Sequence, residues 1–293
     1  MPVTVGARLL FSPSNTGPLR TANQVVTIHD MATFDCPEVF SRPFAAWYRY
    51  LLPRIAKRAR HILTVSEFVK DRIVTHTGVE ASKITVIPNG VNERFCPKAV
   101  ADLTFAMTSL HLPSSTYILV VGSLEPRKNL GRLLQAWAQV QGRLPKEVWL
   151  VIVGAAGDSR VFAGVEFWKL PPRVFLTGPV NDSLLPSLYA GALASAYVSI
   201  YEGFGLPVLE AMASGTPVLA SSHSSLSEVV GQAGLIVNPL NIEEIAEGIV
   251  CLVQDQAMRE NLRNAGLLRA SQYSWGKTAR KTWDVLQRVA CAN

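Results

Sequence analysis

The sequence predicts an α/β protein built from two doubly wound domains. Short runs of β-branched residues alternate with helix-like segments along nearly the whole chain of 293 residues, which is the pattern of parallel sheets covered by helices. The length suits two domains of about 100–200 residues, and 48% hydrophobic residues are enough to bury a substantial core in each. Fibrous and disordered classes are therefore excluded.

The first group of elements predicts an incomplete domain. Its strands are VVTIH (25–29), ILTVS (62–66) and ITVIP (84–88). A helix is expected over 44–60 with a kink at Pro53, and another over 66–78 with Ser66 as its cap and Gly78 at its end. Because the chain opens on the loop-like LLFSPSNTGPL, we expect this domain to lack its N-terminal strand and helix units.

A domain boundary is predicted after the turn sequence PNGVN (88–92), because residues 93–115 have no sustained periodicity. The expected domains are 1–98, 99–272 and a last helix in 273–293, capped by Ser274, that packs back toward the first domain. Strands of the second domain are expected at 117–122, 148–154, 174–178, 194–200, 216–221 and 234–238, and helices near 129–141, 182–191, 206–214, 241–254 and 256–270. Residues 155–173 are expected to be irregular and to carry no chemistry.

Composition narrows the cellular setting. The four cysteines lie far apart with no C-x-x-C pair, which favours a reducing compartment and argues against a zinc site or a disulfide framework. No run of 18 apolar residues and no signal-like start is present, so a cytoplasmic location is expected. The net charge of +6 suggests nucleic-acid binding as one alternative, but no recognisable module supports it.

Two cations stand at a predicted turn between a strand and a helix. In VVGSLEPRKNLGRLLQAW (120–137) the strand ends at Gly122, and Arg127 and Lys128 come just before a helix that begins near Asn129. Cations beside a helix N-terminus, at the carboxyl edge of a parallel strand, suit a phosphate or diphosphate. A solvated basic turn is the simpler alternative at this stage.

The stretch YEGFGLPVLEAMASGTPV (201–218) combines two acids with a glycine-rich turn. Glycines let the backbone approach a ligand, and a helix is expected to start near Pro207. Glu202 and Glu210 are natural acceptors for sugar hydroxyls, although Glu210 taken alone is equally well explained as a surface acid.

Five motifs in order carry a family resemblance. EGFGLPVLEAMASGTPV with its E-x7-E spacing, GSLEPRKNL, VTIHD, LTVSEF and IPNGVNERF together resemble the family 4 retaining glycosyltransferases of the GT-B fold, in particular the bacterial mannosyltransferase-like branch. The resemblance runs from about Ser12 to the last helix and implies two Rossmann-like domains, the first of them truncated.

The resemblance also implies roles for individual residues. Arg127 and Lys128 would neutralise the diphosphate leaving group, Glu202 would bind the transferred sugar, and Glu210 the ribose. His29 would reach the sugar near the reacting carbon. The remaining donor-binding positions implied are Gly122, Val180, Gly203, Phe204, Gly205 and Leu206.

The implied activity is metal-independent, retaining transfer of a hexosyl group, with mannosyl expected, in cell-surface polysaccharide or lipopolysaccharide biosynthesis. The donor would be GDP-mannose or a UDP-sugar, the acceptor a glycan or lipid-linked glycan, and no cofactor is expected; no D-x-D metal motif is present. A catalytically impaired nucleotide-sugar-binding protein or fragment is the alternative, and a nucleotide-sugar epimerase or phosphorylase is a third.

A basic segment at 39–60 holds six Lys and Arg residues and no acid. Aromatic residues lie among them, which suits peripheral contact with an anionic membrane at the inner face of the plasma membrane. A solvated helix with its aromatic side chains packed inward explains the same pattern.

Overall fold

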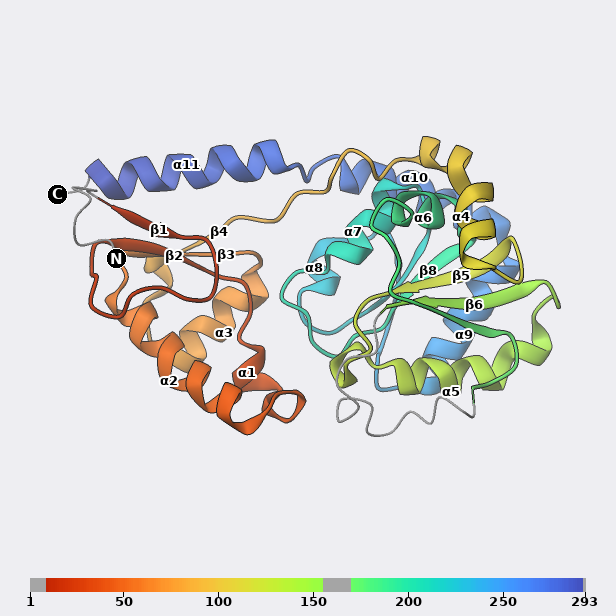
Figure 1. The fold of residues 1–293 in the computed structure, drawn as a ribbon, viewed down its shortest axis with the longest axis horizontal. Coiled ribbons are helices and arrows are strands. Elements are labelled where there is room, and N and C mark those ends of the chain that lie inside the picture. The colour runs from red at the N-terminus through yellow and green to blue at the C-terminus, as the bar shows by residue number, and fades with distance from the viewer. Residues whose placement is uncertain (1–8, 155–169, 292–293) are drawn as a thin grey trace. The chain divides into compact units, whose positions relative to one another are not determined.

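The computed structural model describes residues 9–154 and 170–291, and the chain divides into two compact units (Figure 1). Most of the segment 155–173, expected to be irregular, lies outside the described residues. The first unit comprises Met1–Gly90, Glu202–Phe204 and Tyr273–Asn293, and the second comprises Val91–Tyr201 and Gly205–Gln272. The domain limits at 98 and 272 remain a prediction.

The first unit is a parallel four-stranded sheet with helices on both faces, in the order β1-β2-β3-β4. One face carries α1–α3 and the other carries α11 (Figure 1). The elements are β1 Leu10–Ser12, β2 Gln24–Ile28, α1 Ala32–Asp35, α2 Arg42–Arg58, β3 His61–Thr64, α3 Glu67–Thr77, β4 Ile84–Val86 and α11 Trp275–Cys291.

Local signals explain these boundaries. Ser66 accepts a hydrogen bond from Val69 N at the start of α3, and Gly78 ends that helix in the left-handed region with φ of 67°, as the sequence predicts. Ser274 caps α11 by accepting from Lys277 N at 3.3 Å. The helix α2 runs continuously through Pro53. Short turns of 3₁₀ helix occur at Pro37–Val39 and Ala81–Lys83.

The expected opening loop contains a strand. β1 pairs in parallel with β2, with Leu10 opposite Gln24 and Ser12 opposite Val26. The core on this side of the sheet joins Val25 and Leu63 with Val285 and Val289 of α11, so the last helix completes the hydrophobic core of the first unit.

The second unit is a parallel six-stranded sheet in the order β10-β9-β8-β5-β6-β7, which is the doubly wound Rossmann arrangement. Its strands are β5 Thr116–Val121, β6 Val148–Val153, β7 Val174–Gly178, β8 Ala194–Tyr197, β9 Val218–Ser221 and β10 Leu235–Val237. Its helices are α4 Leu103–Leu110, α5 Leu130–Val140, α6 Leu185–Gly191, α7 Leu206–Ala213, α8 Leu226–Val230, α9 Ile242–Gln254 and α10 Gln256–Ala270. Short 3₁₀ turns lie at Pro97–Asp102, Pro126–Lys128 and Gln141–Arg143.

Helices cover both faces of this sheet. In Figure 1 α5 and α9 lie together on one face, and α4, α6, α7 and α10 lie on the other. Residues of α5 spaced three and four apart, including Leu130, Leu133 and Trp137, are buried against the sheet, which is the pattern of an amphipathic helix. Residues 97–110, expected to be without regular structure, instead form a 3₁₀ turn and α4.

Candidate functional site

The strand order of the second unit reverses between β5 and β8, which lie side by side. In open α/β sheets ligands bind outside the carboxyl ends of the strands at such a switch point. Gly122 directly follows β5, and the stretch from Val198 to Tyr201 follows β8. The candidate site is therefore built from the loops after these two strands.

The 3₁₀ turn Pro126–Lys128 brings both predicted cations to this point. Arg127 Nη1 donates to Tyr201 O at 3.4 Å, and the Arg127 carbonyl accepts from Ile200 N at 2.8 Å, so the turn is tied to the loop after β8. Lys128 Nζ donates to the Tyr197 hydroxyl at the end of β8 over 2.7 Å. A Cβ on Gly122 would lie 3.8 Å from Lys128 Cε, so the lysine stem passes over this glycine.

Glu125 is the counter-ion of this turn. Its Oε2 accepts from Arg127 Nε at 2.6 Å, and its Oε1 accepts from Ser123 Oγ at 2.7 Å. Burial raises the pKa of Glu125, but the Ser123 hydrogen bond and the charges of Arg127 and Lys128 outweigh it and leave the pKa below its usual value. An anion bound here would compete with the ionised Glu125 carboxylate for the Arg127 guanidinium.

Asn129 anchors the turn, and sequence reasoning did not identify it as a site residue. It takes the left-handed conformation with φ of 62°, which asparagine tolerates better than most residues, and only 4% of it is exposed. Its Nδ2 donates to Val198 O at 3.0 Å and Pro239 O at 2.6 Å. One side chain thus fixes the cation turn to the segments that follow β8 and β10.

Glu210 lies on α7, a helix that begins at Leu206 after Gly205. Gly205 has φ of 100°, and a Cβ there would come within 2.5 Å of Leu226 Cδ2, so this start requires glycine. Burial raises the pKa of Glu210 to about 7, against the opposing influence of the Tyr189 hydroxyl and the Arg94 guanidinium. Glu210 is therefore no ordinary surface acid, because its side chain is partly buried and burial disfavours the charged form.

Val180 occupies the loop between β7 and α6, two residues beyond the end of β7 at Gly178. The predicted residues of the second unit thus lie in three places. Gly122 and Val180 lie just beyond the ends of β5 and β7, and Arg127 and Lys128 lie on the turn after β5. Gly205, Leu206 and Glu210 lie at the start of α7 or within it, after β8.

The other predicted residues, His29, Glu202, Gly203 and Phe204, belong to the first unit. His29 follows β2; its backbone N–H donates to Asn15 Oδ1 at 2.7 Å, and its Nε2 lies 2.8 Å from Pro13 O. Because a carbonyl only accepts, Nε2 carries the proton, and in the neutral ring Nδ1 is the acceptor. The loop after β1, which sequence reasoning left without a role, therefore sets the orientation of His29.

The segment Glu202–Phe204 is closely packed within the first unit. A Cβ on Gly203 would lie 2.3 Å from His29 O, which only glycine avoids, and Gly203 O accepts from Ser66 Oγ at 2.7 Å. Glu202 is 7% exposed, and the Phe204 ring meets the Tyr273 ring edge-on at 6.0 Å.

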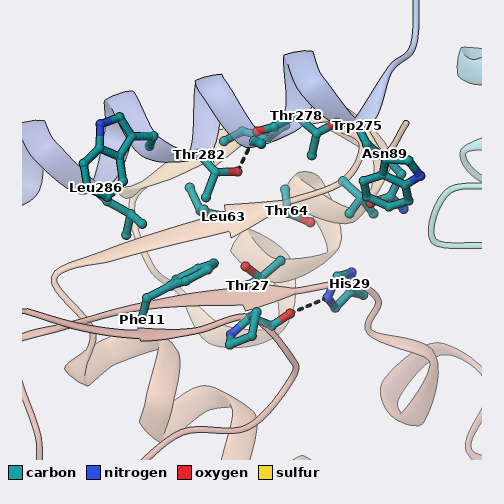
Figure 2. Close-up of a pocket in the computed structure, with 15 residues that line it drawn as sticks. Phe11, Thr27, His29, Leu63, Thr64, Asn89, Trp275, Thr278, Thr282 and Leu286 are labelled. Carbon is teal, nitrogen blue, oxygen red and sulfur yellow. Dashed lines mark hydrogen bonds between the residues drawn. The ribbon is translucent and has the colours of Figure 1, made fainter. Parts of the chain in front are cut away.

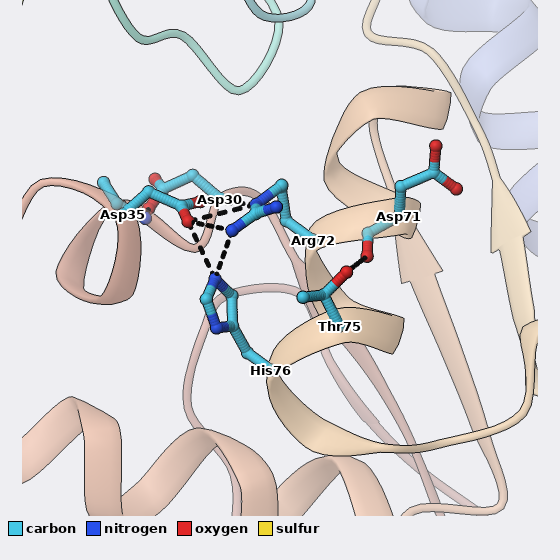
Figure 3. A network of polar contacts seen from close by, with 7 residues as sticks. Asp30, Asp35, Asp71, Arg72, Thr75 and His76 are labelled. Carbon is cyan, nitrogen blue, oxygen red and sulfur yellow. Dashed lines mark hydrogen bonds and ion pairs between the residues drawn. The ribbon is translucent and has the colours of Figure 1, made fainter.

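A polar cluster in the first unit ties α1, which begins at Ala32, to α3 (Figure 3). Arg72 Nε donates to both oxygens of Asp35 at 3.0 Å, and His76 Nε2 lies 2.7 Å from Asp35 Oδ1. Burial raises the pKa of Asp35, but hydrogen bonds from Arg72 and His76 reverse this and lower it. The neighbouring Asp30 accepts a hydrogen bond from the backbone N–H of Ala32, the first residue of α1.

The helix α2 exposes aromatic rings. Phe44, Trp47 and Tyr50 are 44%, 54% and 47% exposed, so for these three the alternative of inward-packed aromatics is wrong. The Arg54 guanidinium lies 3.5 Å from the Tyr50 ring centroid. In the part of the chain that the structure describes, no helix combines the length and apolar character needed to cross a bilayer.

Two family models match this chain: "Glycosyltransferase Family 4" over residues 10–95 and "Glycosyl transferases group 1" over residues 108–269. The second alone covers more than half of the chain. The chain belongs to glycosyltransferase family 4. The resemblance that five sequence motifs predict is thereby confirmed.

Relatives of this family 4 protein include bacterial mannosyltransferases. It is 34% identical over 267 residues to O-antigen chain mannosyltransferase B of Escherichia coli, covering 90% of this chain and 70% of the relative. It is 33% identical over 260 residues to O-antigen chain mannosyltransferase RfbU of Salmonella typhimurium, covering 83% and 67%.

Solved structures establish the fold. Sucrose-phosphate synthase from Thermosynechococcus elongatus matches with a TM-score of 0.75 and 25% identity over 92% of this chain and 68% of that one. WaaG, a glycosyltransferase involved in lipopolysaccharide biosynthesis, matches with a TM-score of 0.75 and 17% identity over 96% and 78%. The predicted GT-B class of two Rossmann-like units is confirmed.

Proposed function

We propose that this family 4 glycosyltransferase moves a mannosyl group, with retention of configuration, from a nucleotide diphosphate sugar to a glycan or lipid-linked acceptor in cell-surface polysaccharide synthesis. The observation that carries the proposal is the pair Arg127 and Lys128, which the strand topology and Asn129 hold at the switch point between β5 and β8. The printed names of the two O-antigen mannosyltransferases support mannose as the sugar.

The cations account for the chemical step without a metal. As the bond to the donor sugar breaks, negative charge develops on the departing diphosphate, and fixed cations that face that charge stabilise the transition state more than the ground state. Glu125 keeps Arg127 oriented before the donor arrives. Glu202 would accept hydrogen bonds from hydroxyls of the sugar, and Glu210 would accept them from hydroxyls of the ribose. His29 would lie near the reacting carbon.

A transfer assay tests the proposal directly. Purified protein is incubated with radiolabelled GDP-mannose, or with UDP-glucose, which is bound in one structural relative, and with mannose-terminated glycans. Lys128→Ala should lower kcat at least tenfold, because one fixed charge in a desolvated site contributes about 2–4 kcal/mol. An unchanged kcat in the folded variant would refute the role of this cation. Donor binding without transfer by the wild-type protein would favour the alternative of a nucleotide-sugar-binding protein.

We also propose that α2 makes the peripheral membrane contact. Three exposed aromatic rings and the basic residues Arg42, Arg49, Arg54, Lys57 and Arg58 lie on this one helix. Aromatic rings suit the interface region of a bilayer, and each basic residue near an anionic surface contributes about 1 kcal/mol. Sedimentation with vesicles should show more binding to anionic than to neutral lipid, and Trp47→Ser should weaken it. Equal binding to anionic and neutral vesicles would refute the membrane hypothesis.

A further inference from the structure

A cavity of about 380 Å³ lies in the first unit between the sheet and α11 (Figure 2). Its volume falls within the range of small-molecule binding sites. Phe11, Leu63 and Ile87 line it from the side of the sheet, and Ala279, Trp283 and Leu286 line it from α11. All of its lining residues belong to the first unit, so the cavity is a property of that unit alone.

The cavity has one polar end. His29 and Asn89, which follow β2 and β4, lie at that end beside Trp275, whereas Phe11 and Leu286 lie at the far end (Figure 2). The polar end is therefore at the carboxyl edge of the sheet, where α/β sheets bind ligands. An elongated space with this polarity suits an amphipathic molecule.

The lining residues are poorly suited to hydrogen-bond or ion-pair with a charged or highly hydroxylated ligand. None of the described lining residues is Asp, Glu, Lys or Arg. Three of the lining threonines donate their hydroxyl protons to main-chain carbonyls: Thr64 to Ile28, Thr278 to Pro88 and Thr282 to Thr278. A phosphate or a free sugar would lose its hydration in the body of the cavity without gaining partners.

The side chains of α11 differ in how far they are buried. Val285 and Val289 are buried in the core of the unit, whereas Trp275 and Trp283 are 47% and 59% exposed at the cavity. Positions 275, 279, 282 and 286 recur at three- and four-residue intervals, so one helix face lines the space. Large exposed rings beside an apolar cavity gain burial when an apolar ligand enters.

We propose that this cavity binds a linear apolar chain, alkyl or isoprenyl, carried by the acceptor, with the acceptor's hydroxyl-bearing part at His29. The inference rests on the proposed function, because His29 is the residue that the function places near the transferred sugar. Continuity between His29 and the apolar space gives the acceptor a single path from the reacting end to the hydrocarbon end.

Alkyl α-mannosides with butyl, octyl and dodecyl chains, used below their micelle concentrations, test the cavity without any donor. Binding is followed by quenching of tryptophan fluorescence with a bromine at the chain end. Affinity should rise at least tenfold from butyl to octyl, because more hydrocarbon leaves water. Trp283→Phe should remove much of the quenching but keep the binding measured by calorimetry.

Matched substitutions on α11 complete the test. Ala279→Phe fills the cavity and should weaken octyl mannoside binding at least tenfold, whereas Gln287→Phe, at an exposed position outside the cavity, should bind as the wild type does. Circular dichroism verifies that both variants fold. Affinity that is independent of chain length, unchanged binding by Ala279→Phe, or unchanged quenching in Trp283→Phe would overturn the proposal.

The two proposals fail in different ways. Chain-length-dependent binding without mannosyl transfer from any donor would refute the transferase function and leave the apolar cavity as a binding site. Transfer to butyl and octyl mannosides with equal KM would support the transferase and overturn the cavity inference.

Discussion

The protonation of Glu210 should affect the stability of the second unit, and the same carboxyl group is expected to bind the donor. Burial raises its pKa from 4.5 to about 7, so the folded chain holds a proton between these values that the unfolded chain has released. The contribution of Glu210 to stability is therefore greatest below pH 4.5, falls as the pH rises, and is lowest above pH 7. The difference corresponds to at most about 3 kcal/mol, at about 1.4 kcal/mol for each pKa unit.

Glu210→Gln should remove this pH dependence, because the amide has a similar shape and no charge. We expect the variant to exceed the wild type in free energy of unfolding by up to about 3 kcal/mol at pH 8 and to match it near pH 4.5. Donor affinity should change in the opposite direction, falling about tenfold, because a charged acceptor makes the stronger hydrogen bonds to ribose hydroxyls.

Urea unfolding at pH 4.5, 6 and 8 measures the stability of both proteins, and calorimetric titration with GDP-mannose and UDP-glucose measures donor binding. The control is Glu147→Gln, because Glu147 is exposed. A stability difference that is the same at all three pH values would refute the assignment of the titration to Glu210. A more stable variant with unchanged donor affinity would refute its place in the donor site.

Three further substitutions test the supports of the site. Asn129→Ala should destabilise by about 2 kcal/mol and lower kcat, because two main-chain acceptors lose their donor; Asn129→Gly keeps the left-handed turn, so a full rescue by glycine would contradict the anchoring role. Ser66→Ala should cost about 2 kcal/mol in urea unfolding, because it removes both the α3 cap and the hydrogen bond to Gly203 O, and Ser66→Thr should restore most of it. Asp35→Asn should cost about 2 kcal/mol at pH 7. The loss should shrink as the pH falls below 3.8, because the lowered pKa of the wild-type carboxyl stabilises the fold fully above pH 3.8 and progressively less below it; a loss that is constant down to pH 3 would contradict this.

The sequence predicts most of the regular structure because its signals are local. The nine predicted strands all occur, and the caps at Ser66, Gly78 and Ser274 follow from residue type. The strand β1 was missed because three residues are too few to show alternation. The helix α4 was missed because only Ala106 of its residues is buried, which leaves no periodic apolar face.

Site residues that belong to a local sequence motif could be predicted. Site residues whose contacts are with distant parts of the sequence could not. Arg127, Lys128 and Glu210 stand in local patterns, whereas Asn129 contacts Val198 and Pro239, 69 and 110 residues away. The raised pKa of Glu210 depends on burial, which no spacing reveals. Nor does the sequence show the cavity beside α11, which forms only when the two ends of the chain pack together.

That packing has a consequence for the order of folding. The core of the first unit joins Val25 to Val285 and Val289, which lie much later in the chain and come after every other buried residue among those described. We therefore expect the reverse of the usual order, in which the N-terminal unit folds first during synthesis, because the second unit holds all of its own strands before α11 is made. Closing so long a span of chain is slow, so one face of the first unit's sheet stays uncovered until α11 is made. A ribosome that stalls within α11 would release a chain with a folded second unit and an aggregation-prone first one.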